Sequence, residues 1–195
     1  MQPRAIANRL TQRALRVLAA TPLRRFVRQQ SGTTTIEFAI VITPFLALLF
    51  ATIETAIVFF AGQTLETAVA DSGRLIMTGQ AQQKGFDQAA FKNAVCSRIY
   101  AMFDCQGGLI VDVRKYTSFS AAQTTKPIDA SGNLTGNFAY QPGCPGDIVV
   151  VRVMYPWPVY VSLLGFNLSD MAGNKRLLMA TSAFRNEPFT TSGSC

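Results

Sequence analysis

The sequence has no histidine among its 195 residues, which removes the commonest general base and a common metal ligand. It has no CxxC motif, no glycine-rich phosphate loop and no recognisable pair of catalytic carboxylates. These absences exclude histidine-dependent triads and argue against a zinc site or a thiol–disulfide enzyme. We therefore expect a protein that is not an enzyme and that needs no metal and no other cofactor.

Acidic residues are absent from the first 32 positions, whereas residues 33–195 contain eleven basic and eleven acidic residues. The net charge of +7 therefore belongs to the leader alone, and it resides in seven arginines: Arg4, Arg9, Arg13, Arg16, Arg24, Arg25 and Arg28. Confined basic charge beside an apolar run is typical of an N-terminus that stays in the cytoplasm, so we expect no nucleic-acid partner. The leader is predicted to be either a short amphipathic helix on the inner leaflet or a solvated, poorly ordered segment.

One long apolar run extends from Phe38 to Gly62 and contains a single charge, Glu54. As a helix, this run would be about 36 Å long, enough to cross a hydrocarbon core of ~30 Å with some tilt. Residues 68–70 fit a signal-peptidase pattern, but the run is too long for a secretory signal. We expect three parts in a single-pass inner-membrane protein: a basic cytoplasmic leader (1–32), a transmembrane helix (33–62) and a periplasmic α+β head (63–195).

All four cysteines lie beyond the apolar run, which suits an oxidising compartment such as a periplasm. We predict that Cys96 pairs with Cys105 to close a short loop. A second disulfide would join Cys144 to Cys195 and tie the C-terminal tail to the head. Free thiols are the alternative.

A carboxylate, Glu37, stands at the mouth of the apolar helix, where a charge is costly unless it is paired. If the chain were cut after Gly32, Thr33 would carry a new α-amino group one helical turn away. Glu37 would then pair with that cation, on its own helix or on a neighbouring subunit. The alternative is that Glu37 only marks the site for the enzyme that cuts there.

Gly32, four variable residues, Glu37-Phe38 and the long apolar helix resemble the prepilin peptidase site of type IV pilin-like proteins of the Tad (Flp) subclass. Phe38 stands where that subclass usually has tyrosine. Two further segments are similar to TadE-like proteins: Ala70-Asp71-Ser72-Gly73-Arg74 with Thr78-Gly79, and Ala183 to Phe189.

The resemblance implies a minor pilin or pseudopilin that is required for assembly of a Tad pilus and supports surface adhesion. Its partners would be a prepilin peptidase, other pilins, Tad assembly-platform proteins and the inner membrane. The alternative is an uncleaved, membrane-anchored periplasmic binding or scaffold module unrelated to filaments.

Two more residues of the run are candidates for a role in assembly. Pro44 bends a membrane helix, and the resemblance implies packing against other pilin helices, with a merely tolerated kink as the alternative. Glu54 is expected about 24 Å along the helix from Phe38, near the far interface. It would pair across subunits or reach water by tilting outward, and we favour water.

The remaining pattern predicts an α+β, pilin-like fold, in which the long N-terminal helix continues into a stalk packed on a small, mostly antiparallel sheet. The stalk would bury a stripe from Leu65 to Gly79. The elements expected after it are a break at 80–85, a helix from Asp87 to about Phe103, a strand at 109–116, a loop at 117–146, a central strand at 147–155 and a last strand at 177–185. Pro156-Trp157-Pro158 is expected to end regular pairing, and Tyr160 to Leu164 with Leu168 forms an apolar patch.

Overall fold

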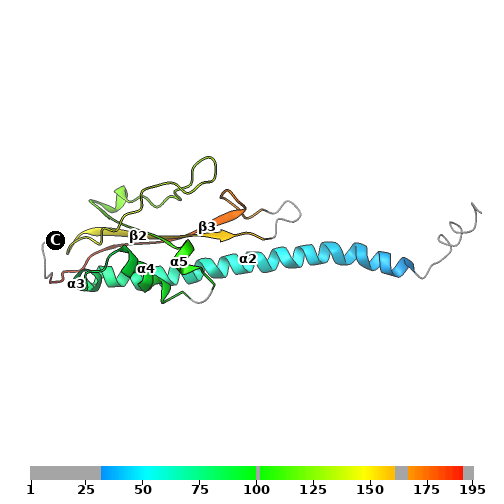
Figure 1. Ribbon diagram of the computed structural model, residues 1–195, viewed down its shortest axis with the longest axis horizontal. Coiled ribbons are helices and arrows are strands. Elements are labelled where there is room, and N and C mark those ends of the chain that lie inside the picture. The colour runs from blue at the N-terminus through cyan, green and yellow to red at the C-terminus, as the bar shows by residue number, and fades with distance from the viewer. Residues whose placement is uncertain (1–31, 100–101, 161–166, 191–195) are drawn as a thin grey trace, which may run out of the picture. The chain divides into compact units, whose positions relative to one another are not determined.

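The computed structural model describes residues 32–99, 102–160 and 167–190 of the chain (Figure 1). The predictions for the basic leader, for Cys195 and for most of the patch after Tyr160 therefore lie outside the described residues. The chain divides into two units, Met1–Leu48 and Leu49–Cys195.

Helix α2 (Thr33–Met77) is 45 residues long, and among the described residues it is the helix long and apolar enough to cross a membrane. In the first unit its large side chains are exposed; Phe38 and Val41, for example, are 65% and 68% accessible. An apolar surface of this kind is stable in lipid rather than in water. The predicted membrane anchor therefore corresponds to an exposed apolar helix.

In the second unit, one stripe of α2 is buried because the head covers it. The stripe recurs every three or four residues, as the helical period requires. Its members are Glu54, Val58, Ala61, Leu65, Ala68, Val69, Ser72 and Ile76. The predicted stalk stripe is confirmed, and it begins further toward the N-terminus, at Glu54.

Two short helices and one of intermediate length follow: α3 (Gln80–Gln83), α4 (Gln88–Cys96) and α5 (Cys105–Gly108). Asp87 caps α4 as predicted, and its Oδ1 accepts the Ala90 N–H at 2.7 Å. The prediction that this helix reaches Phe103 is wrong. A helix continued from Cys96 to Phe103 would carry the chain about 10 Å away from Cys96. Only Asp104 would then remain to bring Cys105 back to its disulfide partner.

The sheet has three antiparallel strands in the order β1-β2-β3: β1 (Ile110–Tyr116), β2 (Ile148–Pro158) and β3 (Lys175–Arg185). The central position of β2 is confirmed, and its residues from Val149 to Met154 are buried. A central strand is covered on both faces, which explains its nearly continuous β-branched sequence.

Along β2, the backbone N–H and C=O groups point alternately toward β3 and toward β1. Hydrogen bonds at both ends of the pairing with β3 show which residues point toward β3. The Val159 N–H donates to the Asn174 carbonyl at 3.0 Å, and the Asn186 N–H donates to the Asp147 carbonyl at 2.8 Å. The backbone N–H and C=O groups of the odd-numbered residues of β2 therefore point toward even-numbered residues of β3. The backbone groups of the even-numbered residues of β2 point toward β1.

This alternation explains why the prediction for Pro156 and Pro158 is wrong. Both prolines pair with β3, up to Pro158 opposite Lys175. Their nitrogens face the β1 side, and β1 reaches no further than Ile110 opposite Met154. The prolines lack a backbone N–H only on the β1 side, and β1 has already ended at that point. No hydrogen bond of the sheet is therefore lost.

Helices and the long loop lie on opposite faces of the sheet (Figure 1). Val111 and Val113 of β1 join the helix-side core with Phe91 and Val95 of α4. On the other face, the loop from residue 117 to residue 146 crosses over Asp112, whose exposed fraction is 0%. The fold is therefore α+β, as predicted.

Asp112 anchors this loop to the sheet through four donors. Its carboxylate accepts from the Arg114 Nε at 3.0 Å, from the Arg152 Nε and Nη2 at 3.0 and 2.5 Å, and from the Ala139 N–H at 2.9 Å. Both oxygens of this buried carboxylate accept hydrogen bonds, so neither is left unsatisfied. The network positions the loop over β1.

Candidate functional site

The segment from Gly32 to Phe38 is exposed at the start of α2. Thr33 is the first residue of the helix, and no atom lies within 4 Å of the position that a Cβ on Gly32 would occupy. Glu37 lies one turn after Thr33 on the same helix face. Among the described residues Glu37 has no ion-pair partner. Thr33 and Glu37 are thus both exposed at the start of the helix.

Pro44 lies inside α2, and the helix continues on both sides of it. A proline here removes the donor that would bond the carbonyl of Ile40. The neighbouring Thr43 hydroxyl donates to the carbonyl of Ala39 at 2.7 Å, which adds a local bond to this turn. Packing of Pro44 against other helices stays a prediction.

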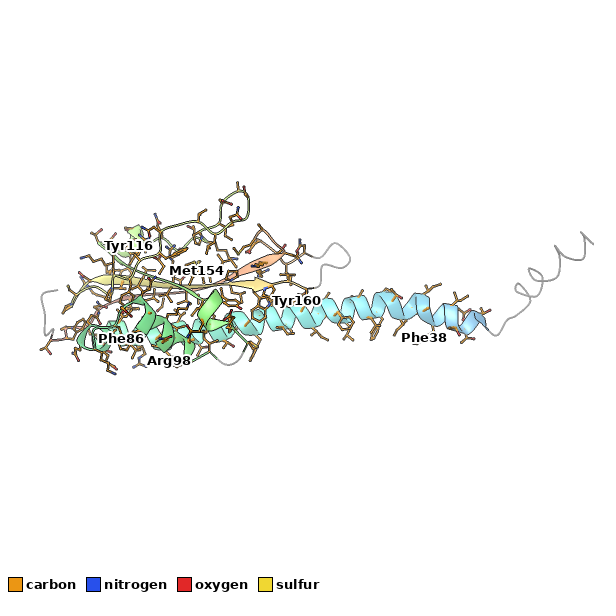
Figure 2. All side chains as sticks on the ribbon, in the orientation of Figure 1. Phe38, Phe86, Arg98, Tyr116, Met154 and Tyr160 are labelled. Carbon is orange, nitrogen blue, oxygen red and sulfur yellow. A yellow bond between two sulfur atoms is a disulfide. The ribbon has the colours of Figure 1, made fainter. Side chains whose placement is uncertain are left out.

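Glu54 is buried with 7% of its surface exposed, and its Oε1 accepts the Tyr160 backbone N–H at 2.5 Å. Tyr160 lies beside α2 (Figure 2). The prediction that this carboxylate reaches water is therefore wrong. A buried carboxylate needs donors, and the chain just after β2 supplies one. Because Glu54 and Tyr160 lie 106 residues apart, no local sequence pattern predicts this contact. The bond fixes the end of β2 against α2.

The C-terminal end of α2 is held by the last described segment of the chain. Gly79 adopts a φ of 77°, the left-handed conformation that commonly ends a helix. A Cβ on Gly79 would lie 2.3 Å from the Phe189 ring, so only glycine fits beneath that ring. The Glu187 N–H also donates to the Met77 carbonyl at 2.9 Å.

Six residues before Gly79, a second close contact joins the same two segments. A Cβ on Gly73 would lie 3.1 Å from the Phe184 ring and 3.5 Å from the Ser182 hydroxyl. Residues 70–79 and residues 183–189 are thus brought together. At both glycines an aromatic ring lies where a larger side chain would stand.

Asn186 ties this C-terminal segment to the chain that precedes β2. Its side chain is buried, and its Nδ2 donates to the carbonyls of Pro142 and Cys144 at 2.9 and 3.0 Å. Gln82 donates to the same Pro142 carbonyl at 3.1 Å. Sequence reasoning missed Gln82, because a glutamine in a short polar helix carries no distinguishing signal.

A family model described as TadE-like protein matches residues 32–74. This segment of the chain is similar to TadE-like proteins. The match begins at Gly32, where the exposed segment starts, and ends at Arg74, beside the contact between Gly73 and Phe184. No curated protein and no solved structure matches the chain.

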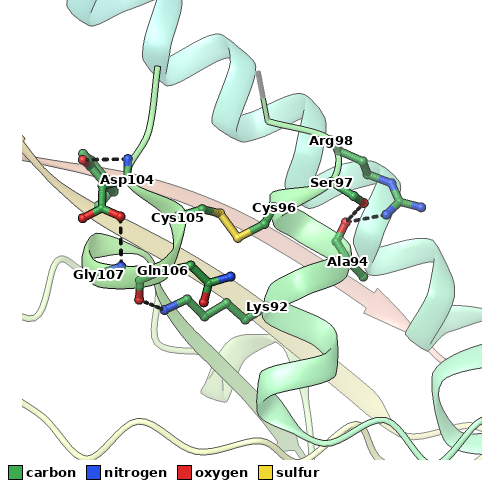
Figure 3. Close-up of a disulfide and its surroundings, with 10 residues drawn as sticks. Lys92, Ala94, Cys96, Ser97, Arg98, Asp104, Cys105, Gln106 and Gly107 are labelled. Atoms are coloured by element: carbon green, nitrogen blue, oxygen red, sulfur yellow. Dashed lines mark hydrogen bonds between the residues drawn. A yellow bond between two sulfur atoms is a disulfide. The ribbon is translucent and has the colours of Figure 1, made fainter. Parts of the chain in front are cut away.

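Outside the TadE-like segment, a disulfide joins Cys96 to Cys105, with a Cα–Cα distance of 5.8 Å (Figure 3). This predicted pairing is confirmed. Nearby, the Lys92 Nζ donates to the Gln106 carbonyl at 2.9 Å, and the Asp104 carboxylate accepts the Gly107 N–H at 3.1 Å. The turn from α4 into β1 is thus closed covalently and by polar bonds.

Cys144 is also disulfide-bonded. Its predicted partner, Cys195, lies outside the described residues, so the second pairing stays a prediction. No free cysteine is found in the described part of the chain.

Tyr140 is the titratable residue of the head whose environment perturbs it most clearly. Its ring lies 5.7 Å from that of Phe91, and within residues 32–190 as described its buried hydroxyl has no hydrogen-bond partner. Burial, and then the nearby charge of Asp87, raise the pKa of Tyr140 from 10.0 to about 12. The phenol therefore stays neutral at physiological pH and acts as a packing group.

Proposed function

We propose that this protein is a minor pilin or pseudopilin required for assembly of a Tad (Flp) type IV pilus, in which it supports surface adhesion. It would be a substrate of a prepilin peptidase and would not be an enzyme. The observation that carries the proposal is the coincidence at Gly32. The TadE-like match starts there, the residue is exposed, and a long apolar helix with Glu37 in its second turn follows.

In this proposal the leader stays in the cytoplasm, because its seven arginines lie beside the apolar helix. The head would lie in the periplasm. The disulfide between Cys96 and Cys105 supports that side, since such bonds persist in an oxidising compartment. Removal of the leader would take away all of the net positive charge.

After cleavage, Thr33 would carry a free α-amino group, and Glu37 would bind it on the same helix or on a neighbouring subunit. A charge-assisted hydrogen bond in a shielded site contributes roughly 1.5–3 kcal/mol. That is enough to strengthen docking to other pilin helices about 10- to 100-fold. Prepilin peptidase, other pilins and Tad assembly-platform proteins would be the partners.

The direct test is the N-terminal sequence of the protein isolated from membranes, which should begin at Thr33. Gly32→Asp should block processing more strongly than Gly32→Ala, because the cut requires a small residue. An intact Met1 would favour the alternative, an uncleaved scaffold module unrelated to filaments.

The same strains test assembly when Glu37→Gln is added. We expect normal leader removal, with loss of co-purification with other pilins. Glu66→Gln is the matched control, because Glu66 is also an exposed carboxylate on α2, where it accepts a hydrogen bond from Gln63 at 3.2 Å. Normal assembly in Glu37→Gln, or a defect of equal size in both variants, would refute the amine-pairing role.

A further inference from the structure

The outer edge of β3 carries backbone groups that face away from the sheet. Because even-numbered residues of β3 bond to β2, the odd-numbered residues point their N–H and C=O groups outward. The chain itself satisfies the first of these groups: the Lys175 carbonyl accepts from Met171, and the Leu177 N–H donates to Asp170 Oδ1 at 2.6 Å.

The next outward groups along β3 have no such partner. Within the described ranges 32–99, 102–160 and 167–190, the N–H and C=O of Met179, Thr181 and Ala183 make no hydrogen bond. The side chains of Thr181 and Ala183 are exposed as well. Three consecutive outward positions therefore present donors and acceptors at the spacing of a strand ladder.

The opposite edge of the sheet is treated differently. At β1, the Val113 N–H donates to Ala139 and its carbonyl accepts from Gln141, both at 2.8 Å, while Gln88 donates to the Val111 carbonyl at 2.7 Å. The chain thus covers the edge of β1 with its own loop and an α4 side chain. The edge of β3 is left open over a length that fits a partner strand.

The open stretch also lacks the charges that usually protect an edge. From Leu177 to Phe184 the strand has no charged residue, whereas Lys175, Arg176 and Arg185 stand at its ends. Pairing of two antiparallel copies would place Arg185 of one chain near Lys175 and Arg176 of the other, which is destabilising. The charge pattern disfavours a second copy and favours a partner with acidic ends.

A cavity of about 310 Å³ adjoins the start of the open edge. Its apolar wall comes from Val58, Phe59 and Gly62 of α2 together with Leu168, and β3 contributes residues 176–179. Alternate side chains of a strand added to β3 would point toward α2. The cavity has room for one bulky apolar side chain from such a strand.

We propose that the outer edge of β3 binds an extended segment of a partner protein by strand addition. The bound segment would pair with Met179, Thr181 and Ala183, place an apolar side chain in the cavity, and carry acidic residues near its ends. This mode uses backbone hydrogen bonds for affinity and alternate side chains for specificity. The proposal concerns the head alone and does not depend on cleavage after Gly32.

The test uses the purified full chain in detergent and a fluorescein-labelled peptide, Glu-Thr-Phe-Thr-Val-Thr-Glu. Fluorescence anisotropy should show saturable binding below about 1 mM. Thr181→Pro should weaken binding about 10-fold or more, because it removes an outward N–H and places a ring at the edge. Thr181→Val, which keeps that N–H, is the matched control and should bind like the wild type.

Two peptide controls need no change in the protein. A peptide with N-methylated alternate amides should not bind, and one with lysine in place of both glutamates should bind about 10-fold more weakly. Amide hydrogen exchange at Thr181 and Ala183 should slow when the first peptide is added, an effect that docking through side chains alone would not produce.

Absence of saturable binding, or equal binding to Thr181→Pro, would overturn the proposal. Equal binding of the N-methylated peptide would show that no ladder forms, with the same consequence. Self-association of the wild-type chain that Thr181→Pro abolishes would assign the edge to a second copy and overturn the heterotypic partner. Unfolding followed by the single tryptophan, Trp157, checks that the proline variant is folded.

Discussion

Replacing Gly79 by alanine should destabilise the head, because this glycine is constrained by its backbone and by its surroundings. Its φ of 77° lies in the left-handed region, which costs a residue with a Cβ about 1–2 kcal/mol. The added methyl carbon would also lie 2.3 Å from the Phe189 ring, a distance that no real contact allows. The ring must therefore move away from the helix end.

The second contribution can be estimated from the burial of Phe189, which is half-buried. Full burial of a phenylalanine side chain is worth roughly 1.5–3 kcal/mol, so displacing a half-buried ring costs about 1 kcal/mol. Together, the two effects predict that Gly79→Ala lowers the free energy of unfolding by about 2–3 kcal/mol.

Gly85 provides the matched control, because its φ is 62° and no atom lies within 4 Å of the position of its Cβ. Gly85→Ala should cost only the backbone contribution, about 1–2 kcal/mol. Urea unfolding of the full chain in detergent, followed by Trp157 fluorescence, measures both. Equal losses in the two variants would refute the claim that Phe189 covers Gly79. In a Phe189→Ala background, the excess cost of Gly79→Ala should disappear.

Two other changes test contacts within the head. Glu54→Ala should lower the free energy of unfolding by about 1–3 kcal/mol, because it leaves the Tyr160 N–H without its acceptor. Glu54→Gln should lower it by less. Unchanged stability of the isolated subunit would mean that Glu54 acts only between subunits. Because burial favours the neutral phenol of Tyr140, its contribution to stability is fully present below pH 10 and is lost as pH rises toward its pKa of about 12. Alkaline unfolding curves should show that loss in the wild type and a smaller loss in Tyr140→Phe; identical curves would contradict it.

Features that depend on composition over many residues could be predicted from the sequence. The apolar run of α2, its buried stripe from Leu65 to Ile76 and the β-branched central strand β2 all follow from local hydrophobic patterns. The cap at Asp87 follows from a residue type that prefers one position. Such signals involve only a few neighbouring residues, so they can be recognised without knowledge of the tertiary structure.

Features that depend on distant partners could not be predicted in the same way. Pro156 and Pro158 continue β2 because their nitrogens face the side where β1 has ended, and nothing near the prolines reveals that register. Glu54 has a backbone partner 106 residues away, so no local pattern predicts that this carboxylate is buried rather than solvated. Within the candidate site, the spacing of Gly32 and Glu37 could be predicted from the sequence. The contacts that hold the head on α2 could not.

The way the end of α2 is held has a consequence for biogenesis. Met77 and Gly79 are synthesised well before their partners Glu187 and Phe189; Gln83 and Thr190, which also bond, are 107 residues apart. A nascent chain that has not yet reached β3 therefore has an unfinished helix end and an incomplete sheet. The head cannot complete its fold until β3 and the segment after it have been synthesised.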